Sequence, residues 1–455
     1  MILKKSVFAH FLIKNDMCCA YNALTMKRCF FNKKNLLDIQ KYLEHPTKNN
    51  LLSINDVICQ NLQDIDILIP KEIDEEKYLE KNRDKLLKQT NIRVMILHMT
   101  DFCNLRCKYC FVEHNMPKHF CRQNMSKEVM HKAIDKFVSL INKYKPDNPI
   151  IVFYGGEPLL NWETVLDGLE YLSNVYPNTN ITKSIITNGT LIVDGIAAEL
   201  KKHNVNVGIS IDGDKISHDA NRIYPNQKGS WKDVLAGIQI LKKHNIEPSA
   251  SCVLPKGNIS RIHKILECLI EDIKFTKIGF NHVSVIASAQ EYDPEYEEKY
   301  SQCLLDAADT IIDKYPYVYE QKIGDKLQAF LSNQITRSSC TACGEQINVS
   351  TQGEIGLCQG FIGTKNTFNN TVFNEEYDPN QDEMFIEWGK RTPFFIKECL
   401  DCIALSTCGG GCPKNAKVVS GSAFNRDISF CHFSKKVQEW LIWKDLELNK
   451  CKQQK

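Results

Sequence analysis

The sequence predicts an α/β protein whose central part is a parallel β-sheet covered by helices. Between about residues 92 and 285, β-branched apolar segments alternate with amphipathic helical segments. Repeated strand–helix units form parallel sheets with right-handed crossovers, either open or closed into a full or partial barrel. In both arrangements the functional residues lie at the carboxyl ends of the strands.

The chain divides into four segments by pattern. Residues 1–70 read as three short strands (SVFAHFLI, MCCAYNAL, KRCFF) followed by two helices (KKNLLDIQKYLEH, SINDVICQNL), and residues 71–91 read as a charged helical linker. Residues 92–330 hold the βα units and further helices from about 294. The expected strands there are IRVMILHM, PIIVFY, TKSIIT, NVGISI, SASCVL and KIGFNHV, and the helices include residues 126–144, 193–203, 231–244 and 258–271. Residues 331–455 are rich in Cys and Gly and end in a helix near 433–447.

Composition excludes several classes of protein. With 455 residues and 43% hydrophobic content the chain can bury a core, and its formal net charge of +2 does not favour nucleic acid or an anionic membrane as partner. No segment reaches the roughly 18 apolar residues of a membrane span. The N-terminal run MILKKSVFAHFLIKND is interrupted by His10 and lacks a cleavage site. We therefore expect a cytoplasmic protein.

Twenty cysteines in such a compartment are reduced thiols, so metal or redox chemistry must explain most of them. Eleven fall into three spaced groups, and the other nine are scattered and read as ordinary small apolar residues. The groups are Cys103, Cys107 and Cys110; Cys340, Cys343 and Cys358; and Cys399, Cys402, Cys408, Cys412 and Cys431.

The first group stands in the segment MTDFCNLRCKYCF, directly after the first expected barrel strand. Three thiolates can hold a 4Fe–4S cluster and leave one iron free for an outside ligand, whereas a structural zinc site closes with four ligands. The pattern thus predicts a cluster with an open iron. The alternative is a zinc knuckle whose fourth ligand comes from elsewhere, such as His114.

The C-x3-C-x2-C motif with an aromatic residue before its third cysteine resembles the cluster loop of radical S-adenosylmethionine (SAM) enzymes. Further motifs of that family follow in order: YGGEP at 154–158, ITNGT at 186–190, SIDG at 210–213 and HDANR at 218–222. The resemblance implies a partial (β/α)6 barrel. It also implies contacts to SAM from Tyr109, Gly155, Gly156, Glu157, Asn188, Ser210 and Arg222.

The C-terminal cysteines resemble the SPASM domain, which binds two auxiliary 4Fe–4S clusters in full-length members. The matching spacings are Cys343-x9-Gly353-x4-Cys358 and Cys399-x2-Cys402-x5-Cys408-x3-Cys412, with Cys431 later. The resemblance implies one cluster on Cys340, Cys343, Cys358 and Cys412 and another on Cys399, Cys402, Cys408 and Cys431, hence three clusters in all. Zinc in one or both four-thiolate sites is the alternative.

The resemblance also implies a peptide substrate. The segment CQGFIG at 358–363 is similar to that of maturases that form cysteine thioether crosslinks in ribosomal peptides (RiPPs), the sactipeptide and ranthipeptide makers. Anaerobic sulfatase maturases instead carry an Asp base at the position of Gln359, and an amide cannot take a proton. Residues 1–70 resemble winged-helix domains that bind the precursor's leader peptide as an added strand.

The expected activity is therefore that of a radical SAM oxidoreductase. A 5'-deoxyadenosyl radical abstracts a hydrogen from the peptide, a thioether forms, and an auxiliary cluster accepts the surplus electron. A low-potential donor such as flavodoxin or ferredoxin is the expected second partner. Alternatives are another peptide modification (a carbon–carbon or carbon–oxygen crosslink, epimerisation or formylglycine formation) and a non-enzymatic peptide-binding module with structural zinc.

Overall fold

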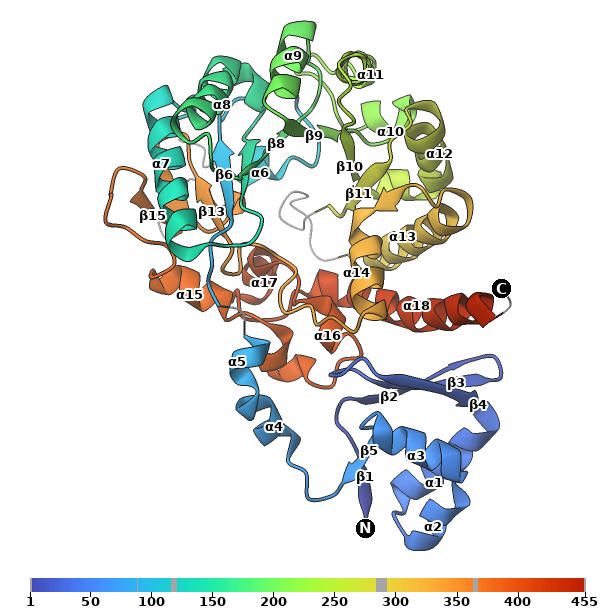
Figure 1. Ribbon diagram of the computed structural model, residues 1–455. Coiled ribbons are helices and arrows are strands. Elements are labelled where there is room, and N and C mark those ends of the chain that lie inside the picture. The colour runs from blue at the N-terminus through green and yellow to red at the C-terminus, as the bar shows by residue number, and fades with distance from the viewer. Residues whose placement is uncertain (1, 88, 116–120, 284–292, 363–366, 454–455) are drawn as a thin grey trace. The chain divides into compact units, whose positions relative to one another are not determined.

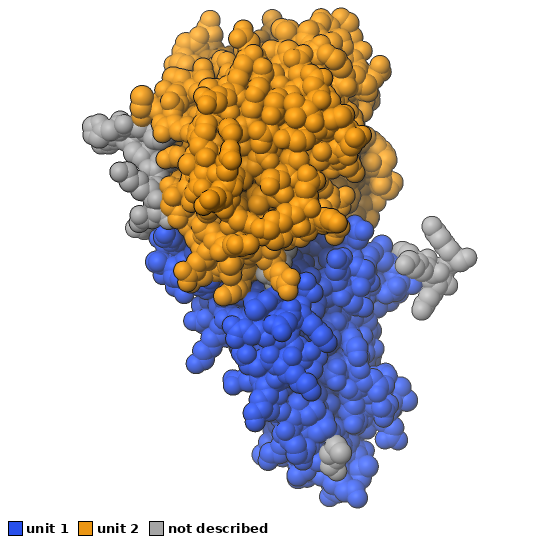
Figure 2. Space-filling model, turned by 60° about the vertical axis from the view of Figure 1, so that its left-hand side comes forward, with its two compact units in different colours: residues 1–88, 325–340, 391–455 blue, residues 89–324, 341–390 orange. Residues whose placement is uncertain are grey.

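The computed structural model describes residues 2–87, 89–115, 121–283, 293–362 and 367–453. The chain forms two compact units, coloured separately in Figure 2. Unit 1 comprises residues 1–88, 325–340 and 391–455, and unit 2 comprises residues 89–324 and 341–390. This grouping differs from the four segments expected from sequence, because the Cys-rich segment 331–455 is shared between the two units.

Unit 2 contains the predicted barrel strands. All six are present as β6 (Val94–His98), β7 (Ile150–Tyr154), β8 (Thr182–Thr187), β9 (Val205–Ser210), β10 (Ser249–Val253) and β11 (Lys277–Asn281), and neighbouring strands are parallel. Helices follow the strands and lie on the outside of the curved sheet (Figure 1). They include α7 (Lys127–Tyr144), α8 (Trp162–Val175), α9 (Asp194–Lys202), α10 (Lys215–Asp219), α11 (Trp231–Lys243), α12 (Ile262–Glu267) and α13 (Pro294–Lys314). The predicted partial α/β barrel is confirmed.

Side chains alternate between the two faces of these strands. Ile185 and Ile209 are fully buried, whereas Ser184 and Ser210, their neighbours in sequence, are only half-buried. Ser210 stands beside Ser251 in the register of β9 and β10. Because successive strand residues point to opposite faces, the apolar set packs under the helices and the polar set lines the other face.

The sheet is larger than predicted. β12 (Tyr319–Glu320) extends one edge, and β13 (Gln346–Val349), β14 (Glu354–Gly356) and β15 (Phe368–Thr371) extend the other, which gives ten strands. β13 pairs parallel with β6, so residues from the Cys-rich segment continue the barrel sheet. The expected helix 258–271 is instead broken into a 3-10 turn η3 (Lys256–Arg261), α12 and the π-helical segment η4 (Cys268–Asp272).

Unit 1 begins with a three-stranded antiparallel sheet of β2 (Ala9–Lys14), β3 (Met17–Asn22) and β4 (Arg28–Asn32), in that order. Three helices follow, α1 (Leu36–Glu44), α2 (Lys48–Ser53) and α3 (Asp56–Asp64), where the sequence predicted two. A second small sheet pairs β1 (Leu3–Lys5) with β5 (Leu68–Pro70). Ala20, Ile39 and Leu62 belong to one buried apolar cluster, so sheet and helices share a core.

The remainder of unit 1 comes from distant parts of the sequence. The helical linker forms α4 (Glu75–Lys81) and α5 (Arg83–Leu86), and the C-terminal segment forms α16 (Leu405–Cys408), α17 (Pro413–Ser420) and α18 (Ile428–Gln453). The Ser406 hydroxyl donates to the Leu24 carbonyl oxygen at 2.8 Å, and Arg28 Nε lies 2.8 Å from Asp445 Oδ2. N-terminal and C-terminal residues therefore pack as one unit. None of the described helices combines the length and apolar character that crossing a membrane requires.

Candidate active site

The three cysteines of the C-x3-C-x2-C motif lie together in the loop between β6 and α6 (Phe111–Asn115). Cys103 is close enough to Cys107 and Cys110 for their charges to interact. Burial raises the pKa of Cys103 to about 12 and that of Cys107 to about 11. The bare thiols of Cys103 and Cys107 are therefore protonated near neutral pH, and binding of a metal cluster must release those two protons. Three convergent thiols fit a 4Fe–4S cluster with one open iron.

The zinc alternative requires several side chains around one ion. Within the described residues, no three Cys, His, Asp or Glu side chains form a group that could hold one metal ion. The thiolates of a cubane bind different irons, so they lie farther apart than the ligands of one zinc ion. The side chain of His114, the fourth ligand in the zinc alternative, lies outside the described residues.

The glycine-rich turn after β7 contacts the main chain of the cysteine loop. The Gly156 N–H donates to the Thr100 carbonyl oxygen at 2.8 Å, and the Glu157 N–H donates to the Phe102 carbonyl oxygen at 2.9 Å. Gly155 has a φ of +133°, and a Cβ at this position would lie 2.6 Å from the Thr100 carbonyl oxygen. The glycines are therefore required for close approach of two backbones, and their predicted contact with SAM stays a prediction.

Glu157 ties this turn to the end of β8. Its buried carboxylate accepts hydrogen bonds from the Thr187 hydroxyl at 2.6 Å, the Asn188 N–H at 2.8 Å and the Leu159 N–H at 3.1 Å. Burial raises the pKa of Glu157 to about 7, while these donors favour the ionised form. Glu157 thus holds two strand ends in place.

Asn188 links the end of β8 to the cysteine loop. Its Nδ2 donates to Asn104 Oδ1 at 2.8 Å, and Asn104 Nδ2 donates to the Thr190 hydroxyl at 2.8 Å. Asn104 lies between Cys103 and Cys107 and was not singled out from the sequence. The sequence does contain a signal for Asn104. It is an amide between two cysteines of the motif, and the Asn-Gly-Thr turn after β8 offers it polar partners.

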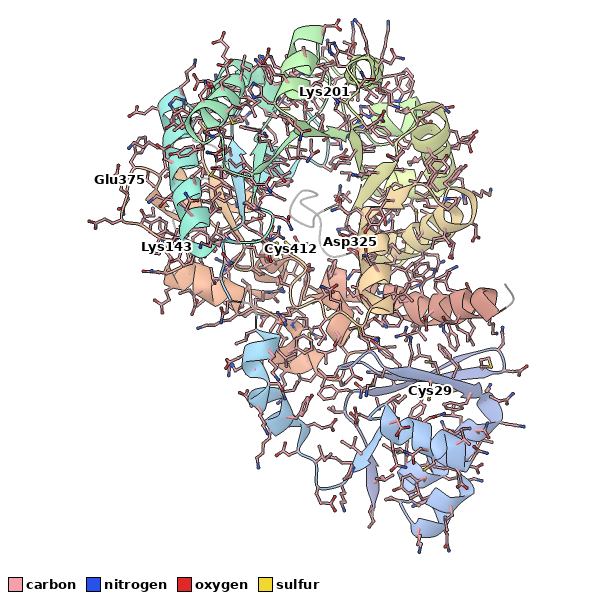
Figure 3. All side chains as sticks on the ribbon, in the orientation of Figure 1. Cys29, Lys143, Lys201, Asp325, Glu375 and Cys412 are labelled. Carbon is pink, nitrogen blue, oxygen red and sulfur yellow. The ribbon has the colours of Figure 1, made fainter. Side chains whose placement is uncertain are left out.

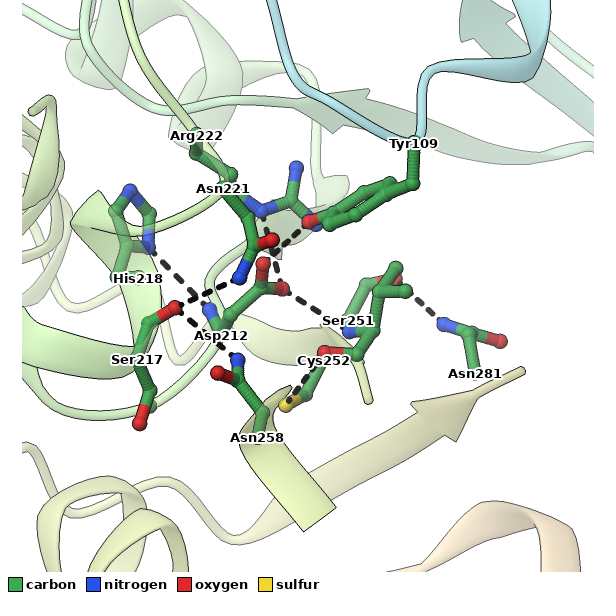
Figure 4. A network of polar contacts seen from close by, with 12 residues as sticks. Tyr109, Asp212, Ser217, His218, Asn221, Arg222, Ser251, Cys252, Asn258 and Asn281 are labelled. Carbon is green, nitrogen blue, oxygen red and sulfur yellow. Dashed lines mark hydrogen bonds and ion pairs between the residues drawn. The ribbon is translucent and has the colours of Figure 1, made fainter. Parts of the chain in front are cut away.

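The end of β9 carries a buried ion pair, shown in Figure 4. Arg222 Nε lies 3.1 Å from Asp212 Oδ1, and the Tyr109 hydroxyl donates to the Asp212 carboxylate. The Val253 N–H donates to Asp212 Oδ1 at 3.0 Å. Burial raises the pKa of Asp212, but Arg222 and the two donors stabilise its carboxylate form. Asp212 is a site residue that sequence reasoning passed over within the SIDG motif.

This pair changes the expectation for Arg222, which was predicted to contact SAM. Arg222 also hydrogen-bonds the Cys107 thiol, and its guanidinium lies 5.4 Å from the centre of the Tyr109 ring. The side chain is therefore already engaged by protein groups, and a contact with SAM would have to use its remaining donors. Ser210, two residues before Asp212, is half-buried, and its contact with SAM stays a prediction.

The second predicted auxiliary quartet gathers within unit 1. The charges of Cys399, Cys402, Cys408 and Cys431 interact with one another, and burial raises the pKa of Cys399 and of Cys431 to about 12. Lys326 is a half-buried cation beside this group: its Nζ donates to the Thr407 carbonyl oxygen at 2.7 Å and lies 5.5 Å from the centre of the Phe430 ring. Four thiols beside a half-buried ammonium suit an anionic thiolate cluster.

The first predicted auxiliary quartet is divided by the two units. Cys340 and Cys412 belong to unit 1, and Cys343 and Cys358 belong to unit 2 (Cys412 is labelled in Figure 3). Within unit 2, Tyr154 is near enough to Cys110, Cys103 and Cys358 for their charges to interact. Cys358 therefore lies on the same side of unit 2 as the cysteine loop, while the shared cluster stays a prediction.

Comparison with known proteins agrees with this site. Residues 97–269 match the model of the radical SAM superfamily. The chain is similar to the radical SAM cyclopropyl synthase TigE of Paramaledivibacter caminithermalis, with 25% identity over 441 residues that cover 89% of each chain.

Two solved structures share the fold. Native anSMEcpe with bound AdoMet has a TM-score of 0.66 and 21% identity, and covers 78% of this chain and 98% of its own. SuiB of Streptococcus suis bound to the precursor peptide SuiA has a TM-score of 0.56 and 15% identity, and covers 94% and 100%. The region that matches the radical SAM model contains the cysteine triad, the glycine turn and the buried ion pair, so residues 97–269 are similar to that superfamily in both sequence and site.

Proposed function

We propose that this enzyme modifies a ribosomally made precursor peptide and forms a cysteine thioether crosslink in it. The observation that carries the proposal is the combination, in one chain, of the radical SAM site with a small N-terminal sheet that has two edge strands. Similarity over 94% of this chain to SuiB, which was solved with its precursor peptide, supports a peptide as substrate.

The N-terminal sheet offers two edges for a leader peptide. Two main-chain hydrogen bonds show which opposed residues of the sheet are hydrogen-bonded to each other. The Ala23 N–H donates to the Phe8 carbonyl oxygen, and the Asn22 N–H donates to the Lys27 carbonyl oxygen. Because pairing alternates along antiparallel strands, the main-chain groups of Ile13 in β2 and of Asn32 in β4 point away from β3. An extended leader can therefore add as a fourth strand at either edge.

Proline substitutions test the two edges separately. Ile13→Pro removes an outward N–H from β2, and Asn32→Pro removes one from β4, where the φ of −69° suits proline. The variant at the edge that binds the leader should lose leader affinity, measured by calorimetry, and peptide modification, while SAM cleavage without peptide continues. Equal affinity of both variants and the parent chain would refute the leader-binding role. Point variants are preferable to deletion of residues 1–70, because that segment is bound to the C-terminal helices by a hydrogen bond and an ion pair.

The residues of the site would supply positioning and electrostatics. When bound, the 4Fe–4S cluster and SAM supply a carbon radical that removes a hydrogen from the substrate. Arg222 and Ser210 are the proposed partners of the SAM carboxylate, and the turn at Gly155 and Gly156 is the proposed partner of its amino group. The quartet of Cys399, Cys402, Cys408 and Cys431 would hold the auxiliary cluster that accepts the surplus electron.

Gln359 argues against formylglycine formation. It opens the 3-10 turn η5 (Gln359–Phe361) directly after Cys358, and its buried Oε1 has no hydrogen-bond partner among the described residues. An amide oxygen can accept a hydrogen bond from a bound peptide but cannot act as a general base. We therefore expect no formylglycine from a sulfatase-type Cys peptide, and Gln359→Asp should leave thioether formation unchanged.

Carbon–carbon bond formation is the second candidate, favoured by the similarity to the cyclopropyl synthase TigE. Both reactions remove two hydrogens per bond formed, but only a thioether consumes a thiol. The deciding experiment incubates the anaerobically reconstituted enzyme with a short peptide encoded beside its gene, and then alkylates the product. Loss of two hydrogens with one fewer alkylatable thiol supports the thioether. Loss of two hydrogens with every thiol retained supports the carbon–carbon bond.

A further inference from the structure

Arg222 lies between an anion and a predicted cluster ligand. Its Nε is 3.1 Å from Asp212 Oδ1, and the same side chain hydrogen-bonds the thiol of Cys107. Asp212 is 0% exposed and Arg222 is 7% exposed, so water screens neither charge. The ion pair is therefore part of the electrostatic surroundings of whatever Cys107 binds.

A second chain of hydrogen bonds joins the same two residues through their main chains. Burial lowers the pKa of His218 to about 3, so its imidazole is neutral. His218 Nδ1 accepts the Asp212 N–H at 3.3 Å, which leaves the proton on Nε2 to donate to the Ser230 hydroxyl at 2.9 Å. Ser230 in turn donates to the Arg222 carbonyl oxygen at 2.9 Å. Asp212 and Arg222 are thus held at both ends, and Figure 4 shows the contact between His218 and Asp212 in this chain.

We propose that Asp212 is a positioning and charge-balancing residue for the cluster on Cys103, Cys107 and Cys110. It fixes Arg222 against Cys107 and cancels the positive charge that Arg222 brings there. The inference rests on the triad holding the SAM-binding cluster, and it is independent of which peptide is modified.

Asp212 matters because a nearby cation changes the reduction potential of the cluster. A buried positive charge beside a cluster stabilises the reduced form, which carries one more negative charge, and so raises the reduction potential. Reductive cleavage of SAM requires a strongly reducing cluster. Arg222 alone would oppose that requirement, whereas the neutral pair keeps its hydrogen bonds without the net charge.

The other titratable groups around Asp212 and Arg222 do not change the net charge of this ion pair. Tyr109 and Tyr154 are buried phenols with raised pKa values, and His218 is neutral. Glu157, the further carboxyl group here, lies beside Cys103 and is bound by donors from β8. Among these described groups, Asp212 is the carboxylate that directly contacts Arg222.

The test compares Asp212→Asn with the double variant Asp212→Asn/Arg222→Gln in the reconstituted full-length enzyme. The amide oxygen introduced by Asp212→Asn can still accept the Val253 N–H, so the single variant removes mainly the charge. An anaerobic redox titration followed by electron paramagnetic resonance gives each midpoint potential, and the signal that changes on SAM addition identifies the relevant cluster. We expect a shift to more positive potential in Asp212→Asn and a return toward the parent value in the double variant.

Tyr109→Phe is the matched control, because it removes a hydrogen bond to Asp212 and keeps both charges. Its shift should be smaller than that of Asp212→Asn. If Asp212→Asn fails to take up iron at the triad but the double variant loads it, an unbalanced buried Arg222 is the cause, and the inference stands. An unchanged or more negative potential in Asp212→Asn, or failure of both variants to load the triad, overturns it. No peptide enters these measurements, so their outcome is separate from that of the proposed function.

Discussion

Gly156 faces the carbonyl oxygen of Phe102 so closely that a Cβ on Gly156 would lie 2.1 Å from that oxygen. The neighbouring Glu157 N–H donates to the same oxygen at 2.9 Å. The turn after β7 and the loop of Cys103, Cys107 and Cys110 are therefore built against each other, backbone to backbone. The position of the cysteines depends on the absence of a side chain one strand away.

Gly156→Ala should displace the cysteine loop. The added methyl group meets backbone rather than a movable side chain, and such overpacking costs about 1–3 kcal/mol. We expect reduced iron at the triad and reduced SAM cleavage, measured by iron analysis and by 5'-deoxyadenosine release. Gly257→Ala is the control, because a Cβ there has no atom within 4 Å. Full iron and activity in Gly156→Ala would contradict this account of the turn.

Replacing Cys103, Cys107 and Cys110 together by Ala should remove about four of about twelve irons, since each cubane contains four. SAM cleavage should disappear, because no open iron remains to bind SAM. Cys121→Ala provides the comparison. Cys121 is exposed and lies outside the three cysteine groups, so this variant should contain as much iron as the parent chain. SAM cleavage by the triple variant would show that the motif has another role.

Lys326→Met should shift the reduction potential of the cluster on Cys399, Cys402, Cys408 and Cys431 to more negative values. The substitution removes a half-buried cation beside Cys408 while keeping similar volume. Lys435→Met is the control, because Lys435 also lies near the quartet but is exposed and screened by solvent. Equal shifts in the two variants would mean that the lower exposure of Lys326 has no special effect.

The stability of the protein should fall as the pH drops below about 6.5. Burial lowers the pKa of His98 and of His218 to about 3, so the unfolded chain binds more protons than the folded one between these values. Each histidine then contributes stability that is complete above about pH 6.5 and declines toward pH 3, by up to about 1.4 kcal/mol per pH unit.

His98→Phe tests this dependence with little change of shape. His98 packs edge-on against Tyr154, and its Nε2 has no hydrogen-bond partner among the described residues, so a phenyl ring is a suitable replacement. Urea unfolding between pH 5.5 and 7.5 should show that the free energy of unfolding changes less with pH in the variant. The difference between the two slopes should correspond to about one titrating group. An identical slope in both proteins would mean that His98 does not titrate as its burial implies.

Much of the fold follows from local pattern. The six barrel strands are short β-branched segments between amphipathic helices, and each of them forms where the pattern predicted. The triad at Cys103, Cys107 and Cys110 was equally predictable from the sequence, because its three cysteines stand on one short loop. The motifs at 154–158 and 210–213 stood at strand ends, where a parallel sheet places its site.

The tertiary structure decided the contacts between distant segments. It joined β13 to β6, brought Cys431 to Cys399 across the C-terminal segment, and set Asp212 against Arg222. Spacing along a chain reports which residues share a turn or a face, but burial and charge pairing are properties of three-dimensional neighbours. Asp212 and Asn104 were ordinary turn residues in sequence and became site residues because folding placed Asp212, fully buried, against Arg222 and Asn104 against the amide of Asn188.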